Sequence, residues 1–378
     1  MQATNGFAVP FRRLGGCVFA LALVISALFA SGASAAKIPV THSDVALGDS
    51  LAFGYSQQLF NENVPGENPA AFEHGYANYY FNGSKQKAAG SQLINLGCPG
   101  ETTDSMIGNG AIAVALGETE GESPCGYHKL GLPLHHEYGG EKSQLEAALE
   151  VLGVNAALGK PATTVTLNIG ANDELHAIAK CEAEVKAEFE AEGKSKYGGS
   201  PEEAVKHCIE SHATALFEHI IHNIARIVFA LRHGELFGSV NYTGKIVFMG
   251  AYDPYGNVCG EEPACLAAFK LSKPNAEVLT GSRTLASILD FNEKKTLTDE
   301  GEEALKEGHE PFKVCFTEIL PVFNPGNAKE PLRLKAWTNM TNFTESNGKA
   351  NGPDIHATPT GYHVLGAVQA IKQCGPAE

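Results

Sequence analysis

Ser50 stands at a position where a serine could act as a nucleophile. It follows the predicted strand segment 44–48 and Asp49, where a buried strand would give way to a helix. Ligands collect at such strand ends in parallel sheets. Backbone N–H groups and the positive end of the helix would also favour negative charge on a bound carbonyl oxygen. Taken alone, the serine could equally be a helix N-cap without chemistry.

A serine nucleophile needs a base that takes its proton during attack and returns one to the leaving alcohol. His356 is the candidate, because it lies on a late loop just before a predicted helix at residues 361–373. Asp354 could hold the imidazole in the right tautomer and stabilise the imidazolium. A backbone carbonyl could orient the ring instead. These residues predict ester hydrolysis through an acyl-Ser50 intermediate.

The elements that must position these residues are short buried strands. Aliphatic and β-branched runs followed by glycine-containing turns predict strands at residues 44–47, 93–96, 163–169 and 245–249. Helical stretches such as 142–152 lie between them. This alternation is typical of an α/β protein with a parallel sheet covered on both faces.

Four segments, in order along the chain, resemble the sequence blocks of the GDSL esterases and lipases of the SGNH hydrolase superfamily. Residues 44–51 contain Gly-Asp-Ser-Leu, and residues 95–103 are similar to the second block. Residues 168–173 match the G-x-N-D block, and residues 351–362 carry the aspartate and histidine. The G-x-S-x-G elbow, the phosphate loop and the H-E-x-x-H zinc motif are absent from the sequence.

The resemblance implies roles for individual residues. Ser50, His356 and Asp354 would be the catalytic residues, and the N–H of Ser50, the N–H of Gly100 and the side-chain amide of Asn172 would form the oxyanion hole. It also implies a three-layer α/β/α, flavodoxin-like fold with a central parallel sheet in the order 2-1-3-4-5. No metal and no cofactor would be required.

The last block departs from the family pattern at two positions. The family spacing is D-x-x-H, whereas Asp354 stands two residues before His356 and Pro353 occupies the expected place. Ala357 replaces the proline that commonly follows the histidine. The first departure leaves open whether Asp354 or a backbone carbonyl orients His356.

Residues 174–244 are longer than a crossover needs and predict a helical insertion. A helix should start at Ser200-Pro201, with acids in its first turn, and apolar residues then recur at helical spacing. Histidines on this helix (His207, His212, His219 and His222) lack a carboxylate or cysteine at ligand spacing, so we predict no metal site. Residues 259–329 carry glycine, proline and charge, and we expect an irregular region that wraps the sheet edge or rims a pocket.

The N-terminus predicts secretion. Arg12 and Arg13, an apolar run at 14–30 and the small residues 33–35 form a signal-peptide pattern over residues 1–35. Residues 36–378 would then form one hydrolase domain in an extracellular protein. Cys17 lies near the start of the apolar run instead of after it, which is the wrong place for a lipid-attachment cysteine, so we predict no stable membrane anchor.

Cysteine usage fits an oxidising compartment. Of nine cysteines, Cys17 would leave with the signal, and an even number would remain. Sequence alone does not fix the pairing. We prefer disulfides between cysteines that follow one another in the sequence, because each such disulfide would close one local loop. The preferred pairs are Cys98–Cys125, Cys181–Cys208, Cys259–Cys265 and Cys315–Cys374.

Composition argues against a nucleic-acid partner. The 378 residues are 43% hydrophobic and carry a formal net charge of −15, so a packed core is expected and nucleic acid is a poor partner. An ester or lipid is the expected substrate, and a monomer is the expected state. Alternatives are a carbohydrate acetylesterase or an acyltransferase on the same fold, and a secreted binding protein without catalysis.

Overall fold

The computed structural model of the protein describes residues 42–371, apart from 66, 85–89, 118–124, 140, 257, 260–275, 307–313 and 328. The predicted signal peptide therefore lies outside the described residues. So do Cys265 and Cys374.

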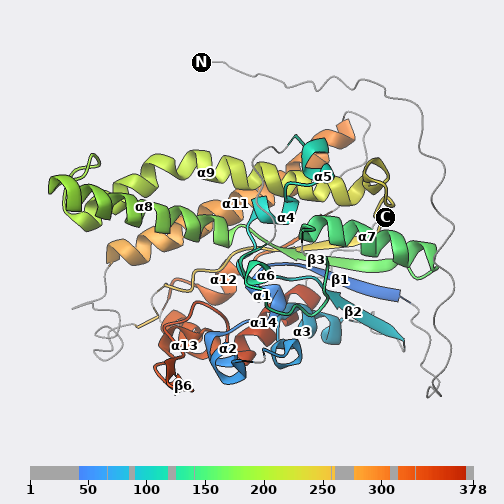
Figure 1. Ribbon diagram of the computed structural model, residues 1–378, viewed down its shortest axis with the longest axis horizontal. Helices are drawn as coiled ribbons and strands as arrows, with labels where there is room; N and C mark the ends of the chain where they lie inside the picture. The colour runs from blue at the N-terminus through green and yellow to red at the C-terminus, as the bar shows by residue number, and fades with distance from the viewer. Residues whose placement is uncertain are drawn as a thin grey trace. The chain divides into compact units, whose positions relative to one another are not determined.

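A parallel sheet of five strands forms the centre of the fold (Figure 1). Its order is β2-β1-β3-β4-β5, as expected, and every neighbouring pair is parallel. Four of the strands lie where the sequence predicted them. The strands are β1 (His42–Gly48), β2 (Ser91–Asn95), β3 (Ala162–Asn168), β4 (Lys245–Met249) and β5 (Val314–Thr317).

Helices cover both faces of the sheet, which makes three layers. On one face, Val45 and Leu47 of β1 pack into a core shared with α7 (Gln144–Ala157) and α9 (Pro201–Arg232). On the other face, Ala46 packs with α3 (Tyr76–Gly83) and α14 (Pro359–Ile371). Because neighbouring residues of a strand point to opposite faces, the consecutive apolar residues 45–47 of β1 suit burial on both sides.

Local sequence signals fix where the main helices begin. Ser143 caps α7 and Ser200 caps α9, each in a capping box with a glutamate three residues later. Pro201 occupies the first turn of α9, where a missing N–H costs nothing. α9 then buries one apolar face on the core, including Ile220, Ile224, Ile227 and Leu231.

α8 (Ala171–Glu192) starts directly after β3 and packs beside α9. Gly170, at φ 114°, makes the sharp turn from the strand into this helix. The disulfide Cys181–Cys208 joins α8 to α9. Figure 1 shows the two helices side by side and extending beyond the sheet.

The expectation of an irregular region at 259–329 is wrong. Within it lie the long helix α11 (Ala276–Lys306) and the fifth strand, β5. The residues of α11 alternate apolar and acidic positions on its buried side, so the sequence shows no clean apolar stripe. The other half of that expectation is correct, because Leu289 and Glu293 of α11 line a pocket.

Shorter elements complete the described chain. The helices are α1 (Ser50–Phe53), α2 (Gln57–Asn63), α4 (Thr103–Ile107), α5 (Ala111–Ala115), α6 (Gly126–Lys129), α12 (Leu320–Phe323) and α13 (Glu330–Trp337). The 3-10 helices are η1 (Pro69–Phe72), η2 (Gly234–Phe237) and η3 (Asn339–Thr341), and a small hairpin pairs β6 (Glu345–Ser346) with β7 (Lys349–Ala350).

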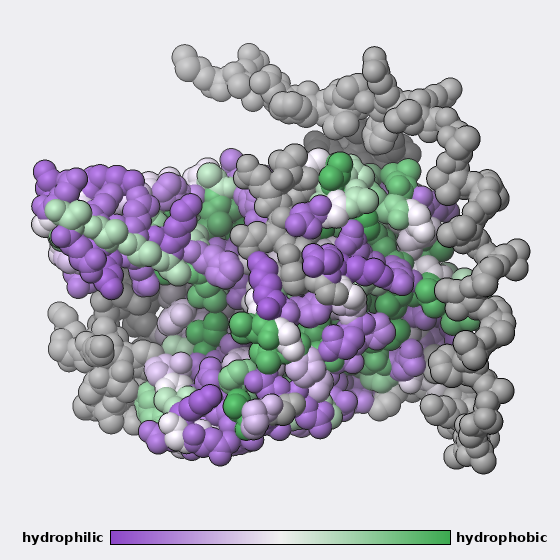
Figure 2. Space-filling model, in the orientation of Figure 1, coloured by the Kyte–Doolittle hydropathy of each residue, from purple (hydrophilic) through white to green (hydrophobic). Residues whose placement is uncertain are grey.

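Among the described helices, α9 alone is long and apolar enough to cross a membrane. Its apolar face is buried against the sheet and neighbouring helices, which is the arrangement of a core helix. The surface of the α8–α9 pair seen in Figure 2 is largely hydrophilic.

Two of the predicted disulfides are present, Cys98–Cys125 and Cys181–Cys208. Cys259 and Cys315 are also disulfide-bonded. The partners we predict for them lie outside the described residues, so those two pairings stay predictions.

Candidate active site

Ser50 is the first residue of α1, immediately after the carboxyl end of β1. The preceding Asp49 caps the helix, its Oδ1 accepting a hydrogen bond from Leu51 N at 2.8 Å and another from Asn168 Nδ2 at 2.7 Å. Gly48 has φ 139°, and a side chain there would collide with Asn168. The Gly-Asp-Ser sequence therefore turns the chain sharply and leaves Ser50 at the edge of the sheet.

A continuous line of hydrogen bonds joins the three residues that the sequence suggested. Ser50 Oγ lies 2.9 Å from His356 Nε2, and His356 Nδ1 lies 2.5 Å from Asp354 Oδ1. Burial alone would raise the pKa of Asp354, but the charge and hydrogen bonds of His356 bring it below the ordinary value. Asp354 is thus an ionised acceptor behind the imidazole.

The loop that carries His356 is held from several sides. Asp354 Oδ2 accepts a hydrogen bond from Gln57 N at 2.8 Å. Asn339 donates its backbone N–H to the carbonyl of His356 at 2.8 Å. The ring of Tyr55 packs edge-on against the imidazole at 4.8 Å between centroids. The ring orientation is therefore set by packing as well as by Asp354, and the shorter Asp-x-His spacing still allows the contact.

Asn172 lies in the same pocket as Ser50, whereas Gly100 lies in the loop after β2. Asn172 lines the same pocket as Ser50 and His356, and its Nδ2 donates one hydrogen bond to the carbonyl of Glu101 at 2.8 Å. The second N–H of this amide remains for a ligand. Gly100 precedes Glu101 in the loop after β2 at φ 80°, and it is not among the residues that line the pocket. Within the described chain, the N–H groups of Ser50 and Gly100 have no hydrogen-bond acceptor.

Glu101 is a buried residue whose hydrogen bonds connect the loop after β2 to α7, and sequence reasoning missed it. Its carboxyl accepts hydrogen bonds from Ser105 Oγ at 2.5 Å and Gln144 Nε2 at 2.7 Å. Gln144 also bonds to both the N–H and the carbonyl of Gly48. Burial raises the pKa of Glu101 to about 8. This network ties the loop that carries Gly100 to the end of β1.

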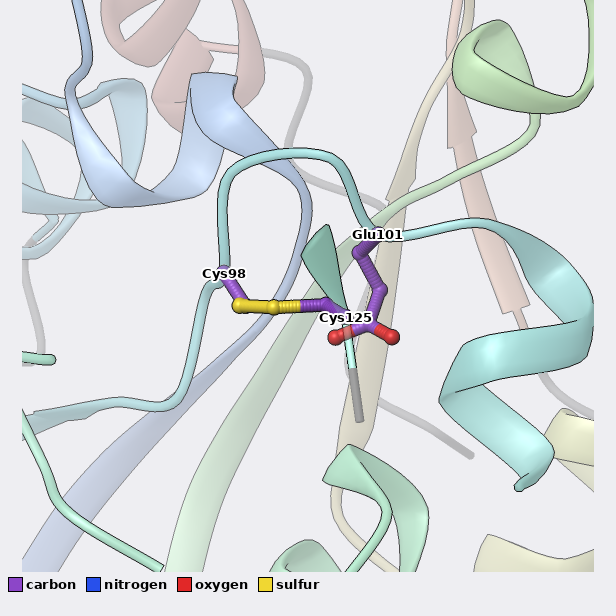
Figure 3. A group of neighbouring side chains, drawn as sticks. All are labelled: Cys98, Glu101 and Cys125. Atoms are coloured by element: carbon purple, nitrogen blue, oxygen red, sulfur yellow. A yellow bond between two sulfur atoms is a disulfide. The ribbon is translucent and has the colours of Figure 1, made fainter. Parts of the chain in front are cut away.

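Figure 3 shows the Glu101 carboxyl beside the Cys98–Cys125 disulfide. These three side chains are the one metal-compatible grouping among the described residues. Disulfide sulfurs are poor metal ligands compared with thiolates, so the donor set does not fit a metal centre. The disulfide instead pins the loop after β2 to the segment that starts α6.

Asp173 plays a similar supporting role. Its carboxylate accepts hydrogen bonds from the backbone N–H and the hydroxyl of Thr103, the latter at 2.6 Å. It therefore anchors the start of α4 and the loop before it. Burial raises the pKa of Asp173 to about 6. On α9, His219 Nε2 lies 2.7 Å from Asp104 Oδ1, a residue of the same helix α4.

A pocket of about 80 Å³ opens beside Ser50. A cavity needs about 10–15 Å³ to hold one water, so this volume accepts a group of roughly five to eight non-hydrogen atoms. Most of its wall is apolar. Glu293 of α11 contributes a carboxyl group to the wall. Its apolar residues include Leu51, Ile169, Leu175, Met249, Leu289 and Ile355.

The missed supporting residues carried weak sequence signals. Asp49, Glu101 and Asp173 each stand beside a residue that the sequence did single out, in or next to a strand-end turn. Carboxyls at such turns often cap the next helix, and this rule could have suggested Asp49 and Asp173. Glu293 and Gln144 lie within helices, where no local signal marks them.

No protein family matches the chain, and no curated protein matches it in sequence. Solved structures do match it. A carbohydrate acetylesterase family member from Sinorhizobium meliloti is 12% identical at a TM-score of 0.37, covering 87% of this chain and 96% of that chain. A lipase from a goat rumen metagenome is 12% identical at 0.41, covering 89% and 100%. A GDSL-like lipase from Parabacteroides merdae is 12% identical at 0.38, covering 88% and 95%. The site geometry therefore carries the functional argument.

Proposed function

We propose that the protein is a serine esterase that hydrolyses carboxylic esters through an acyl-Ser50 intermediate. The observation that carries this proposal is the line of hydrogen bonds from Ser50 Oγ through His356 to Asp354, at 2.9 and 2.5 Å. A buried carboxylate, an imidazole and a serine hydroxyl in this order are the parts of an activated nucleophile.

In the first step, Ser50 Oγ attacks the ester carbonyl while His356 Nε2 accepts its proton. The resulting imidazolium is stabilised by Asp354, which also keeps Nδ1 as the protonated nitrogen. When the tetrahedral intermediate collapses, His356 returns the proton to the leaving alcohol. Water then attacks the acyl-serine with His356 again acting as the base.

The negative oxygen of the intermediate would be stabilised by the N–H of Ser50, the N–H of Gly100 and the amide of Asn172. The proposal is supported by the N–H groups of Ser50 and Gly100, which lack an acceptor within the described residues. The link from Asn172 to the carbonyl of Glu101 keeps the amide next to the loop that carries Gly100. Such fixed donors need no reorganisation during the reaction.

The size of the pocket favours short esters. A space of about 80 Å³ holds an acyl group of a few carbon atoms, whereas a long lipid chain would extend past it. We therefore favour a short-chain esterase, with a carbohydrate acetylesterase as the second candidate. An acyltransferase would use the same acyl-serine with an alcohol in place of water.

We also propose that residues 36–378 form one secreted hydrolase domain. Disulfides support an oxidising compartment for the folded chain, since they seldom persist in the cytosol. The helices α8 and α9 would be a helical insertion at about 174–244 in that domain.

The test is hydrolysis of a chain-length series of 4-nitrophenyl esters by the mature protein made in an oxidising compartment, beside Ser50→Ala. We expect turnover that is highest for short acyl chains and lost in the variant. A fluorophosphonate should label Ser50 in the wild type and leave Ser50→Ala unlabelled.

Folded, disulfide-bonded protein that neither turns over an ester nor reacts with the fluorophosphonate would contradict the proposal. That outcome would favour a binding protein that has the fold without the chemistry. Labelling without turnover would instead indicate an active nucleophile with a narrow substrate range.

A further inference from the structure

Glu293 occupies a position on α11 where an apolar residue would be expected. Leu289 and Leu297, one turn before and after it, are 1% and 2% exposed, and Glu293 itself is 1% exposed. Residues spaced by four lie on one face of a helix, so the glutamate interrupts a buried leucine row. Burying a carboxyl at such a position costs free energy unless it has a partner.

No such partner lies within the described chain. Glu293 Oε2 is fully buried and makes no hydrogen bond there. Its other oxygen faces Gly170, where a side chain would come within 3.5 Å of it. Burial and the neighbouring carboxyls of Asp290, Glu174 and Asp173 hold the pKa of Glu293 well above the ordinary value. These surroundings favour the protonated form of the carboxyl, which can donate as well as accept a hydrogen bond.

The side chain belongs to the wall of the pocket that contains Ser50 and His356. Several other polar groups on that wall are engaged within the protein. Asp49 holds Leu51 N and Asn168, and the hydroxyl of Tyr252 donates to the carbonyl of Ile355 at 2.7 Å. Ser50 and Asn172 keep N–H groups for the oxyanion, and Asn168 Oδ1, which has no partner in the described chain, can only accept a hydrogen bond. Away from the oxyanion donors, a substrate oxygen in this mostly apolar space would therefore find Glu293 as its hydrogen-bond donor among the described residues.

We propose that Glu293 is a specificity-determining residue, which binds an oxygen carried by the part of the ester that enters the pocket. This inference rests on the proposed esterase function and names its substrate class. The class is a small ester in which an ether, hydroxyl or carbonyl oxygen takes the place of a methylene group a few bonds from the scissile carbonyl. The oxygen can belong to the acyl group or to the alcohol, because both flank Ser50.

Matched ester pairs that differ only by oxygen in place of one methylene test this proposal. On the acyl side, the pairs are 4-nitrophenyl methoxyacetate against butanoate, and 3-methoxypropanoate against pentanoate. On the alcohol side, the pair is 2-methoxyethyl acetate against butyl acetate. For each pair the readout is the ratio of kcat/KM for the oxygen-containing ester to that for the hydrocarbon ester. Comparing this ratio between variants cancels the intrinsic reactivity of each ester.

The informative variants are Glu293→Leu, which restores the leucine row, and Glu293→Gln, whose amide still donates a hydrogen bond. We expect the ratio to fall about tenfold in Glu293→Leu for the acyl or the alcohol pairs, and to be largely kept in Glu293→Gln. The pair that responds identifies which side of the ester enters the pocket.

Glu174→Leu is the matched control. Glu174 is a neighbouring acid with a buried oxygen that lacks a hydrogen-bond partner in the described chain, but it lines a different cavity, between α8 and α9. The ratio should not respond to this change. An equal fall in Glu174→Leu would overturn the proposal, because it would point to the general loss of an acid near the site.

A ratio that stays within about twofold of wild type in Glu293→Leu for every pair would also overturn the inference. The esterase function would then still stand, provided that hydrolysis depends on Ser50. If the wild type shows no hydrolysis that depends on Ser50, the proposed function itself is refuted. Fluorophosphonate labelling of each variant confirms that Ser50 is intact, and if Glu293→Leu does not fold, Glu293→Met provides the same loss of a hydrogen-bond donor.

Discussion

Asp354 and Glu293 are both buried carboxyls near Ser50, yet their surroundings differ. Asp354 is 6% exposed, and both of its oxygens accept hydrogen bonds, from His356 and from the backbone of Gln57. Glu293 is 1% exposed, has a fully buried oxygen without a partner in the described chain, and is surrounded by other acids. The pKa of Asp354 is lowered and that of Glu293 is raised.

The difference shows how partners determine what a buried acid can do. Asp354 is ionised and fully engaged, so it can act only through His356. The surroundings of Glu293 favour its protonated form, and its buried oxygen has no hydrogen-bond partner in the described chain, so it can bind a group that arrives from outside. Two residues of similar chemistry would thus serve positioning in one case and recognition in the other.

The largest effect that separates the two acids should follow Asp354→Asn. The amide can no longer stabilise the imidazolium and can favour the wrong tautomer of His356, so we expect kcat to fall on the order of 10³–10⁴-fold with little change in KM. Steady-state kinetics on a short-chain 4-nitrophenyl ester would measure it. Retention of most activity would show that packing and a backbone carbonyl suffice to orient the ring.

Asn172→Ala should give the next largest effect. Removing one oxyanion donor lowers turnover by about 10²–10³-fold in comparable sites. Glu293→Gln keeps a hydrogen-bond donor in the same pocket, so its turnover of the same ester should stay close to that of the wild type. Unchanged turnover in Asn172→Ala, measured at saturating ester, would remove this residue from the oxyanion hole.

The strand positions and the residues around Ser50 could be predicted because their signals are local. Apolar runs that end in glycine identify β1 to β4, and a serine or asparagine next to such a run marks the sheet edge where ligands bind. The capping sequence Ser200-Pro201 likewise specifies the start of α9 without help from the rest of the fold.

β5, the supporting acids and the pocket wall could not be predicted, because they depend on contacts between distant segments. Gln144 meets Glu101 and Gly48 only after α7 packs on the sheet. Glu293 reads as an ordinary helical glutamate until α11 lies over the end of β3. A helix with acids on its buried face gives no clear apolar periodicity, so the sequence pattern of α11 was misleading.

Stability should respond to the two acids with opposite signs. Glu293→Leu removes a buried unpaired carboxyl and completes a leucine row, so we expect the free energy of unfolding to rise by about 1–2 kcal/mol. Asp354→Leu leaves Gln57 N–H and His356 without their acceptor, so we expect a loss of about 1–3 kcal/mol. Urea unfolding at pH 7 would compare them. A loss of stability in Glu293→Leu would mean that the carboxyl has a partner inside the folded protein.

The last effect concerns the pH dependence of stability. Burial and the charges of Asp173 and Asp253 raise the pKa of Glu174 from 4.5 to about 8. Between these values the folded state holds a proton that the unfolded state has lost, so the contribution of Glu174 to stability is fully present below pH 4.5 and disappears as pH rises to about 8. The lowered pKa of Asp354 places its own contribution to stability at lower pH, outside this window.

The protein should therefore unfold at a lower urea concentration at pH 8 than at pH 5. Glu174→Gln should reduce that slope by at most about 1.4 kcal/mol per pH unit. A slope unaltered by the variant would mean that Glu174 is already ionised in the folded protein and that the contrast with Asp354 does not extend to α8.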